Sequence, residues 1–144
     1  MNKTFFLILL FTIFFNITGN TKENFFNEAK NKYENEQMED SKFLFQRNIV
    51  FNPKDAQSYL YLAKIYNFEK NENEELKNLE TTLLLDPENE EAMYMLIEFE
   101  LEKSNFSKVN ELTEKFKIIC LKFCDKTEKI NQKLKDIEPK NTKN

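Results

Sequence analysis

LLLDPENEEA, at residues 83–92, joins an apolar triplet to Asp-Pro, and IVFNPKDA, at residues 49–56, joins another to Asn-Pro. We call the spacing between their two prolines, Pro53 and Pro87, the repeat interval. The 144-residue chain contains only three prolines and one glycine, so this interval uses two of its few helix-breaking residues. Sequence periods of about 20–50 residues are typical of solenoid proteins, and the repeat interval therefore predicts repeated units.

Shifting the sequence by one repeat interval aligns more than the two prolines. Leu62 falls on Leu96, and Asp55 falls on Asn89. Asp and Asn are both favoured immediately before a helix, so each of these residues predicts a helix that begins at the next position. The residue before a proline is pushed out of the α region, which ends the preceding helix. The repeated segment is therefore a boundary between helical units.

Each unit contains two stretches of helical spacing separated by a polar turn. In the middle unit the first stretch places apolar side chains at Tyr59, Leu62, Ala63 and Tyr66, and the second at Leu76, Leu79, Leu83 and Leu84. The sequence predicts an all-α short solenoid of three helix-turn-helix units within residues 20–123, at approximately 22–55, 56–89 and 90–123. Residues 124–144 are predicted to add an amphipathic capping helix, Lys126 to Ile137, and a disordered end.

The middle unit resembles the tetratricopeptide repeat (TPR) family. Its residues match the positions where that family places aromatic, Leu, small, aromatic, aromatic and Pro residues: Tyr59, Leu62, Ala63, Tyr66, Leu79 and Pro87. The third unit departs from the pattern, since Ile97 replaces the small residue and Leu121 replaces the proline. The resemblance implies a curved solenoid whose concave face is lined by the first helix of each unit.

Residues 1–19 have the pattern of a secretory signal. Lys3 precedes eleven largely apolar residues, Phe5 to Phe15, and the small residue Gly19 follows. A membrane-spanning helix needs about 20 apolar residues, which this run does not reach. The sequence predicts an exported protein, periplasmic or secreted, with two alternatives for residues 1–19: an uncleaved anchor attached to the membrane through residues 5–15, or a buried N-terminal helix.

The composition offers little for catalysis. Histidine is absent, which removes the commonest general base and the Ser-His and Cys-His pairs. One glycine excludes the usual phosphate-binding loop. The chain carries a formal charge of −4, and residues 20–121 are its acidic part, which argues against a nucleic-acid partner. We expect no enzymatic activity, no cofactor and no metal.

Cys120 and Cys124 are the two cysteines of the chain. In a continuous helix they would share one face, and they could be two small buried apolar side chains. A break in the helix near Phe123 would instead allow a disulfide, which an exported chain favours. A metal or redox role is the remaining alternative.

The resemblance also implies where a partner would bind. In the TPR family, extended or helical peptides bind the face lined by the first helices. Carried onto this chain, that face contains Phe26, Lys30, Leu60, Tyr61, Lys64, Asn67, Phe68, Tyr94, Met95, Glu98 and Leu101. We expect a non-catalytic scaffold that binds a peptide segment or helix of a protein partner there, or alternatively a membrane-anchored structural component of an envelope complex.

Overall fold

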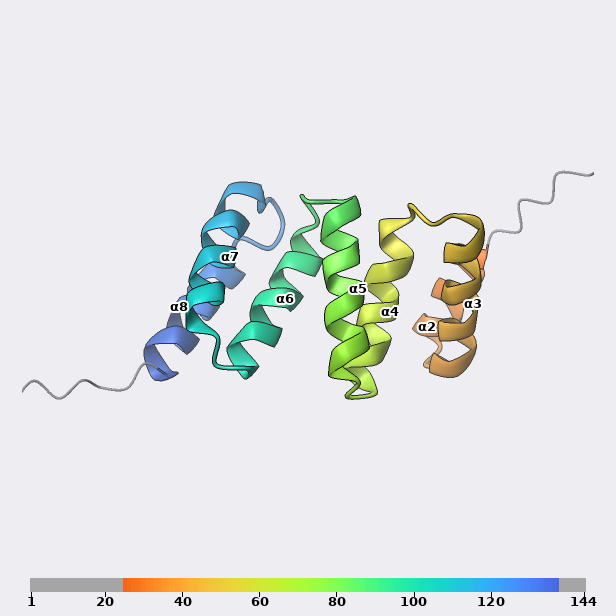
Figure 1. Cartoon of the computed structure of the whole chain (residues 1–144), viewed down its shortest axis with the longest axis horizontal. Coiled ribbons are helices and arrows are strands. Elements are labelled where there is room, and N and C mark those ends of the chain that lie inside the picture. Colours follow the sequence, from red (N-terminus) through yellow and green to blue (C-terminus); the bar gives the residue numbers. More distant parts are fainter. Residues whose placement is uncertain (1–24, 138–144) are drawn as a thin grey trace, which may run out of the picture.

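The structure is a computed structural model that describes residues 25–137. The described residues form seven helices and no strands, which confirms the all-α prediction (Figure 1). The helices are α2 (Phe25–Glu34), α3 (Met38–Phe51), α4 (Ala56–Phe68), α5 (Glu72–Leu85), α6 (Glu90–Glu102), α7 (Phe106–Ile119) and α8 (Lys126–Ile137). Residues 1–24 and 138–144, with the predicted signal and the predicted disordered end, lie outside the described residues.

Three helix pairs stand side by side along the molecule: α2 with α3, α4 with α5, and α6 with α7 (Figure 1). The last helix, α8, packs against both α6 and α7. Segments 52–55, 86–89 and 120–125 join one pair or helix to the next, and all three lie along one edge of the molecule, which we call the linker edge. The turns within the pairs lie along the opposite edge, which we call the turn edge.

Each pair turns at one residue with positive φ. These residues are Glu36, Lys70 and Ser104, with φ of 60°, 59° and 57°, and one repeat interval separates each from the next. In the second pair the Lys70 N–H donates to the Asn67 carbonyl at 3.1 Å, and the Asn71 N–H donates to the Tyr66 carbonyl at 2.9 Å. This is the Schellman arrangement that ends a helix and satisfies its last carbonyls. The backbone therefore repeats with the period of the sequence.

Asp55 and Asn89 both occupy the N-cap position, one residue before a helix, as expected. Only Asn89 caps with its side chain, whose Oδ1 accepts the Ala92 N–H at 3.0 Å. The Asp55 carboxylate instead accepts hydrogen bonds from Asn48 Nδ2 at 2.8 Å and Ser58 Oγ at 2.6 Å. These bonds tie the end of α3 to the start of α4.

The core consists of two clusters of buried side chains. Phe45 is fully buried in the cluster formed by α2, α3 and α4, and Phe116 is fully buried in the cluster that extends from α4 to α8. Leu84, which the helical pattern placed among the packed residues of α5, is instead 81% exposed, so that expectation is wrong. Of the described helices, none combines the length and the apolar character needed to cross a bilayer.

Candidate functional site

The first helices of the pairs, α2, α4 and α6, present an aromatic surface. Tyr61 of α4 lies at its centre, with its ring stacked on Phe45 at a centroid distance of 4.9 Å. The rings of Tyr33 and Phe26, both from α2, meet Tyr61 edge-on at 5.1 and 5.9 Å. We call these four residues the aromatic cluster. Phe45 is buried beneath the other three, which are half-buried and show part of their rings to solvent.

The phenol groups of the aromatic cluster stay protonated near neutral pH. Burial raises the pKa of Tyr61, and the carboxylates of Glu34 and Glu91 raise it further. Burial also raises the pKa of Tyr33, with smaller contributions from Tyr61 and Glu91. Two hydroxyl groups therefore remain available as hydrogen-bond donors beside an apolar surface, a combination that is favoured at protein interfaces.

The lysines near the aromatic cluster are already paired. Lys64 Nζ lies 2.7 Å from Glu91 Oε1 of the next first helix and 4.7 Å from the centroid of the Tyr61 ring. Lys30 Nζ lies 3.7 Å from Glu34 Oε1 on its own helix. Because each lysine has a carboxylate partner, this surface has little net charge. It suits an uncharged aromatic or aliphatic side chain better than a free carboxylate.

The first helix of the third pair is partly covered by the chain itself. Lys133 of α8 forms an ion pair with Glu98 of α6. Burial, followed by the neighbouring Glu98 carboxylate, raises the pKa of Tyr94 to about 12. Met95 is half-buried and packs against the core. The accessible part of the first-helix surface is therefore concentrated on α2 and α4.

The remaining predicted residues have other surroundings. Leu60 and Leu101 belong to the core and are 2% and 5% exposed. Asn67 Nδ2 donates to Glu75 Oε1 at 2.8 Å, which ties α4 to α5. Phe68 is exposed, but it lies at the turn edge. Of the eleven predicted contact residues, the structure groups Phe26, Tyr61 and Lys64, with Lys30 at their margin.

Phe68 lines a surface pocket of about 670 Å³ between the first turn and the end of α4. The pocket is bordered by Glu36, Glu39, Asp40 and Glu69. Lys42 neutralises part of this charge, since its Nζ lies 3.1 Å from Glu39 Oε1 and 2.6 Å from Glu69 Oε1. The described residues that line this pocket include no member of the aromatic cluster.

Sequence reasoning missed Tyr33 and Phe45 as members of the aromatic cluster. Tyr33 lies one residue away from the position that the repeat pattern favours, and Phe45 belongs to a second helix. A signal for Tyr33 was present, because Phe26 and Tyr33 are two helical turns apart and so share one helical face.

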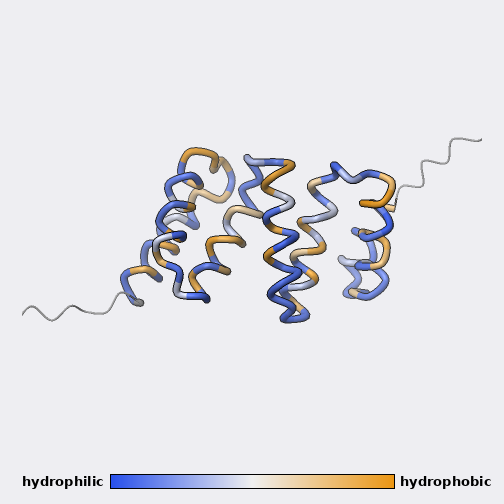
Figure 2. Tube along the Cα trace, viewed as in Figure 1, coloured by the Kyte–Doolittle hydropathy of each residue, from blue (hydrophilic) through white to orange (hydrophobic). Residues whose placement is uncertain are grey.

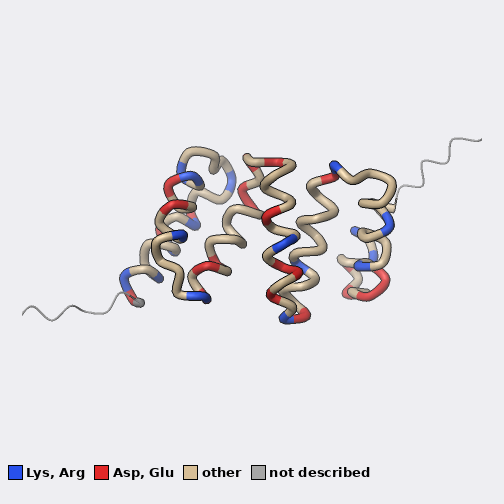
Figure 3. Tube along the Cα trace, viewed as in Figure 1, with Lys and Arg blue, Asp and Glu red and all other residues tan. Residues whose placement is uncertain are grey.

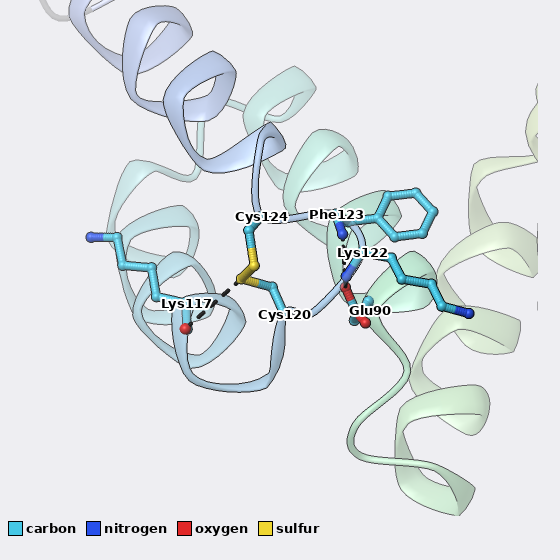
Figure 4. The surroundings of a disulfide bond; sticks show 6 residues. All are labelled: Glu90, Lys117, Cys120, Lys122, Phe123 and Cys124. Carbon is cyan, nitrogen blue, oxygen red and sulfur yellow. Dashed lines mark hydrogen bonds between the residues drawn. A yellow bond between two sulfur atoms is a disulfide. The ribbon is translucent and has the colours of Figure 1, made fainter.

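The two cysteines lie in the segment between α7 and α8, where a disulfide joins them (Figure 4). Their Cα atoms are 5.2 Å apart, because α7 ends at Ile119 before the first cysteine. Glu90, the first residue of α6, fixes the same segment: its Oε2 accepts the backbone N–H groups of Lys122 and Phe123 at 2.8 and 2.9 Å. Within residues 25–137, no group of three His, Cys, Asp or Glu side chains is placed to hold a metal ion.

No family model and no curated protein matches this sequence. Solved structures do match. The type III secretion translocator chaperone SycD of Yersinia enterocolitica is 17% identical with a TM-score of 0.70, and the match covers 85% of this chain and 86% of SycD. SycD in complex with a peptide of the translocator YopD gives the same identity and TM-score and covers 85% of this chain and 95% of that chain.

A third match is the CopN–Scc3 complex, in which the matched chain is 14% identical with a TM-score of 0.64. That match covers 87% of this chain and 74% of the other. Identities this low carry no argument about activity, whereas the TM-scores and the coverage describe a shared arrangement of helices. This chain therefore has the TPR-like helical fold of SycD.

Proposed function

We propose that this chain is a non-catalytic binding protein that holds a peptide segment or helix of a partner protein on the aromatic cluster of α2, α3 and α4. One observation carries the proposal: Phe26, Tyr33 and Tyr61 expose ring surface on the first helices of a fold whose solved neighbour SycD was captured with a YopD peptide. The aromatic cluster supplies rigid apolar area, and its two phenols supply hydrogen-bond donors.

The charges around the aromatic cluster restrict which peptides can bind there. Lys30 and Lys64 are both engaged by carboxylates, so a peptide carboxylate would have to displace Glu34 or Glu91. We therefore favour an internal segment with an aromatic or branched aliphatic residue over a free C-terminus.

We also propose that the protein acts after export, because residues 1–19 have the pattern of a secretory signal. The alternative is a structural component of an envelope complex that stays anchored through residues 5–15. N-terminal sequencing of the protein from its native cells distinguishes the two. A chain that begins at Asn20 supports export with cleavage, and an intact Met1 in the membrane fraction supports the anchor.

The binding surface can be tested with peptides selected from a displayed random library and measured by calorimetry. We expect Tyr61→Ala to lower the affinity for the best peptide by about 30-fold or more. Truncating a central interface tyrosine costs about 2 kcal/mol or more of binding free energy. Phe43→Ala is the matched control, because Phe43 is also exposed but lies on the second helix α3. Equal affinity of both variants for the peptide, with unchanged helical circular dichroism, would contradict the proposal.

A further inference from the structure

The linker edge carries a regular row of exposed apolar side chains. Val50, Leu84 and Ile118 occupy the same position in the three pairs, one repeat interval apart, and are 75%, 81% and 84% exposed. Phe51 and Leu121 extend the row at its two ends and are 70% and 87% exposed. The next-to-last residue of each second helix is therefore an apolar residue that contributes little to the core.

This row is a concentration of apolar surface on one side of the molecule. The described residues contain two other large hydrophobic side chains with comparable exposure, Phe43 within α3 and Phe68 at the turn edge. Figure 2 shows hydrophobic segments at the upper ends of α3, α5 and α7, where the linker edge lies. Exposed apolar patches on a protein typically mark an interaction site, so the linker edge is expected to contact a partner.

The chain that precedes the structure is joined to this same edge. The ring of Phe25, the first residue of α2, stacks on Phe51 at 5.6 Å, so α2 begins at the linker edge. The apolar run Phe5 to Phe15 precedes α2 by residues 16–24, which reach at most about 30 Å when fully extended. In the anchored alternative, in which this run is not cleaved off, a bilayer that received it would lie close to the linker edge, and the inference below rests on that alternative.

From these observations we propose that the linker edge rests on the surface of a lipid bilayer, with the five apolar side chains of the row inserted at the boundary between headgroups and acyl chains. Three helix pairs end at this edge, so they would stand upright on the membrane with the aromatic cluster facing sideways and open to a partner. A bilayer is flat, extends far enough to meet all three pairs at once, and takes up apolar side chains just beneath its polar headgroups.

The charges of the linker edge indicate how this contact is made. The three linkers at this edge contain Lys54, Asp55, Asp86, Glu88, Lys122 and Asp125. Figure 3 shows both signs of charge along this edge. The signs are mixed, so the edge has no basic patch for anionic lipids. The contact therefore depends on apolar insertion, and we expect it to be insensitive to added salt, which screens only charge.

The test places an environment-sensitive fluorophore on single introduced cysteines of the full chain, whose native cysteines are joined in a disulfide. Val50→Cys and Leu84→Cys report on the linker edge, and Phe68→Cys is the control at the turn edge. On adding phosphatidylcholine vesicles that contain a nitroxide-labelled lipid, we expect blue-shifted and quenched emission at positions 50 and 84. Emission at position 68 should not change.

Three results would overturn the proposal. In the first, the full chain does not sediment with the vesicles. In the second, it sediments through its N-terminal run while the label at position 84 stays in water. In the third, that label is already shielded before vesicles are added, which means that residues 5–15 or a second copy of the chain covers the row. Analytical ultracentrifugation separates the last two occupants, since only a second copy changes the mass.

A second measurement checks the energetic role of the row. We expect the double variant Val50→Ser, Leu84→Ser to lower the vesicle partition coefficient by about tenfold or more, because it removes two inserted apolar side chains. The matched double variant Phe43→Ser, Phe68→Ser should partition as the natural chain does. Equal partitioning of both double variants would reject the row as the contact.

Discussion

Three non-glycine residues in the left-handed region make the helix pairs turn. Glu36, Lys70 and Ser104 have φ near +60°, a conformation that costs an L-residue with a Cβ atom about 1–2 kcal/mol. The Schellman hydrogen bonds around each residue hold it there. The chain thus accepts local strain at the same point of every unit, where glycine would be the usual residue.

Replacing Lys70 by glycine should relieve this strain. We expect Lys70→Gly to raise the free energy of unfolding by about 0.5–1 kcal/mol, because the lost steric cost exceeds the extra entropy that glycine gives the unfolded chain. Urea titration followed by circular dichroism measures the change. Lys70→Ala is the control, since it removes the same charge and keeps the Cβ atom. A gain of equal size in the alanine variant would assign the effect to charge and contradict the strain argument.

Glu75 is a buried acidic residue whose surroundings disfavour the ionised form of its carboxyl group. It is 5% exposed, at the position where the neighbouring units have the buried residues Ser41 and Val109. Burial raises the pKa of its carboxyl group, although the hydrogen bond from Asn67 acts in the opposite direction. The folded state therefore binds a proton more tightly than the unfolded state, and ionised Glu75 lowers the free energy of unfolding as the pH rises through its folded pKa.

Glu75→Gln should consequently stabilise the protein at neutral pH relative to the natural chain, with the difference narrowing as the pH falls toward the range where a carboxyl group is protonated. The amide keeps an oxygen that can accept from Asn67 and carries no charge to desolvate. Thermal unfolding at several pH values measures this. Glu80→Gln, at an exposed position of the same helix, is the control. A stability difference that stays constant across this pH range would show that ionisation is not the cause.

The sequence predicted the features of the fold and of the site that depend on neighbouring residues, and it missed those that depend on packing between helices. The repeat interval located Pro87 and the cap Asn89 because prolines and caps act locally. The left-handed residues left no such signal, since Glu, Lys and Ser are ordinary residues in turns and helices alike. The aromatic cluster depends on distances between three different helices, so Phe45 and Tyr33 could be assigned only once the pairing of the helices was known.

The helix α8 was predicted with its observed bounds, Lys126 to Ile137, from its apolar spacing. The segment that leads to it was not, because it contains no proline and its path depends on the disulfide and on Glu90. That segment fixes α8 over α6, where Ile130 is fully buried and Lys133 meets Glu98. The cap of the solenoid is therefore attached by a short cross-linked loop.

Removing the disulfide should loosen this attachment. For so short a closed loop, the lost cross-link changes the free energy of unfolding by about 2 kcal/mol in the chain-entropy model. We expect the double variant Cys120→Ser, Cys124→Ser to melt at a lower temperature and to exchange amide hydrogens faster in α8 than in α4. Melting the natural chain with and without a dithiol reductant is the matched comparison. An equal melting temperature in all samples would mean that the loop is held by Glu90 alone.

The molecule as a whole has two cores that meet in one helix. Leu62 and Ile65 of α4 belong to the cluster shared with α2 and α3, and Leu60 and Ala63 of the same helix belong to the cluster that reaches α8. In solenoids, stability is approximately the sum of each unit and its contacts with neighbouring units. The two ends of this molecule should therefore be able to open separately, with α4 responding to both.

Two matched core substitutions test this division. Phe45→Ala and Phe116→Ala each remove a fully buried ring, at a cost of about 3–5 kcal/mol. Measured by hydrogen exchange and mass spectrometry, the first variant should expose α2 and α3 while α6 and α7 stay protected, and the second should do the reverse. The amides of α4 should exchange faster in both variants, because α4 contributes side chains to each cluster. If either variant instead raises exchange evenly in every helix, the chain unfolds as one cooperative unit and the two clusters are not separate sources of stability.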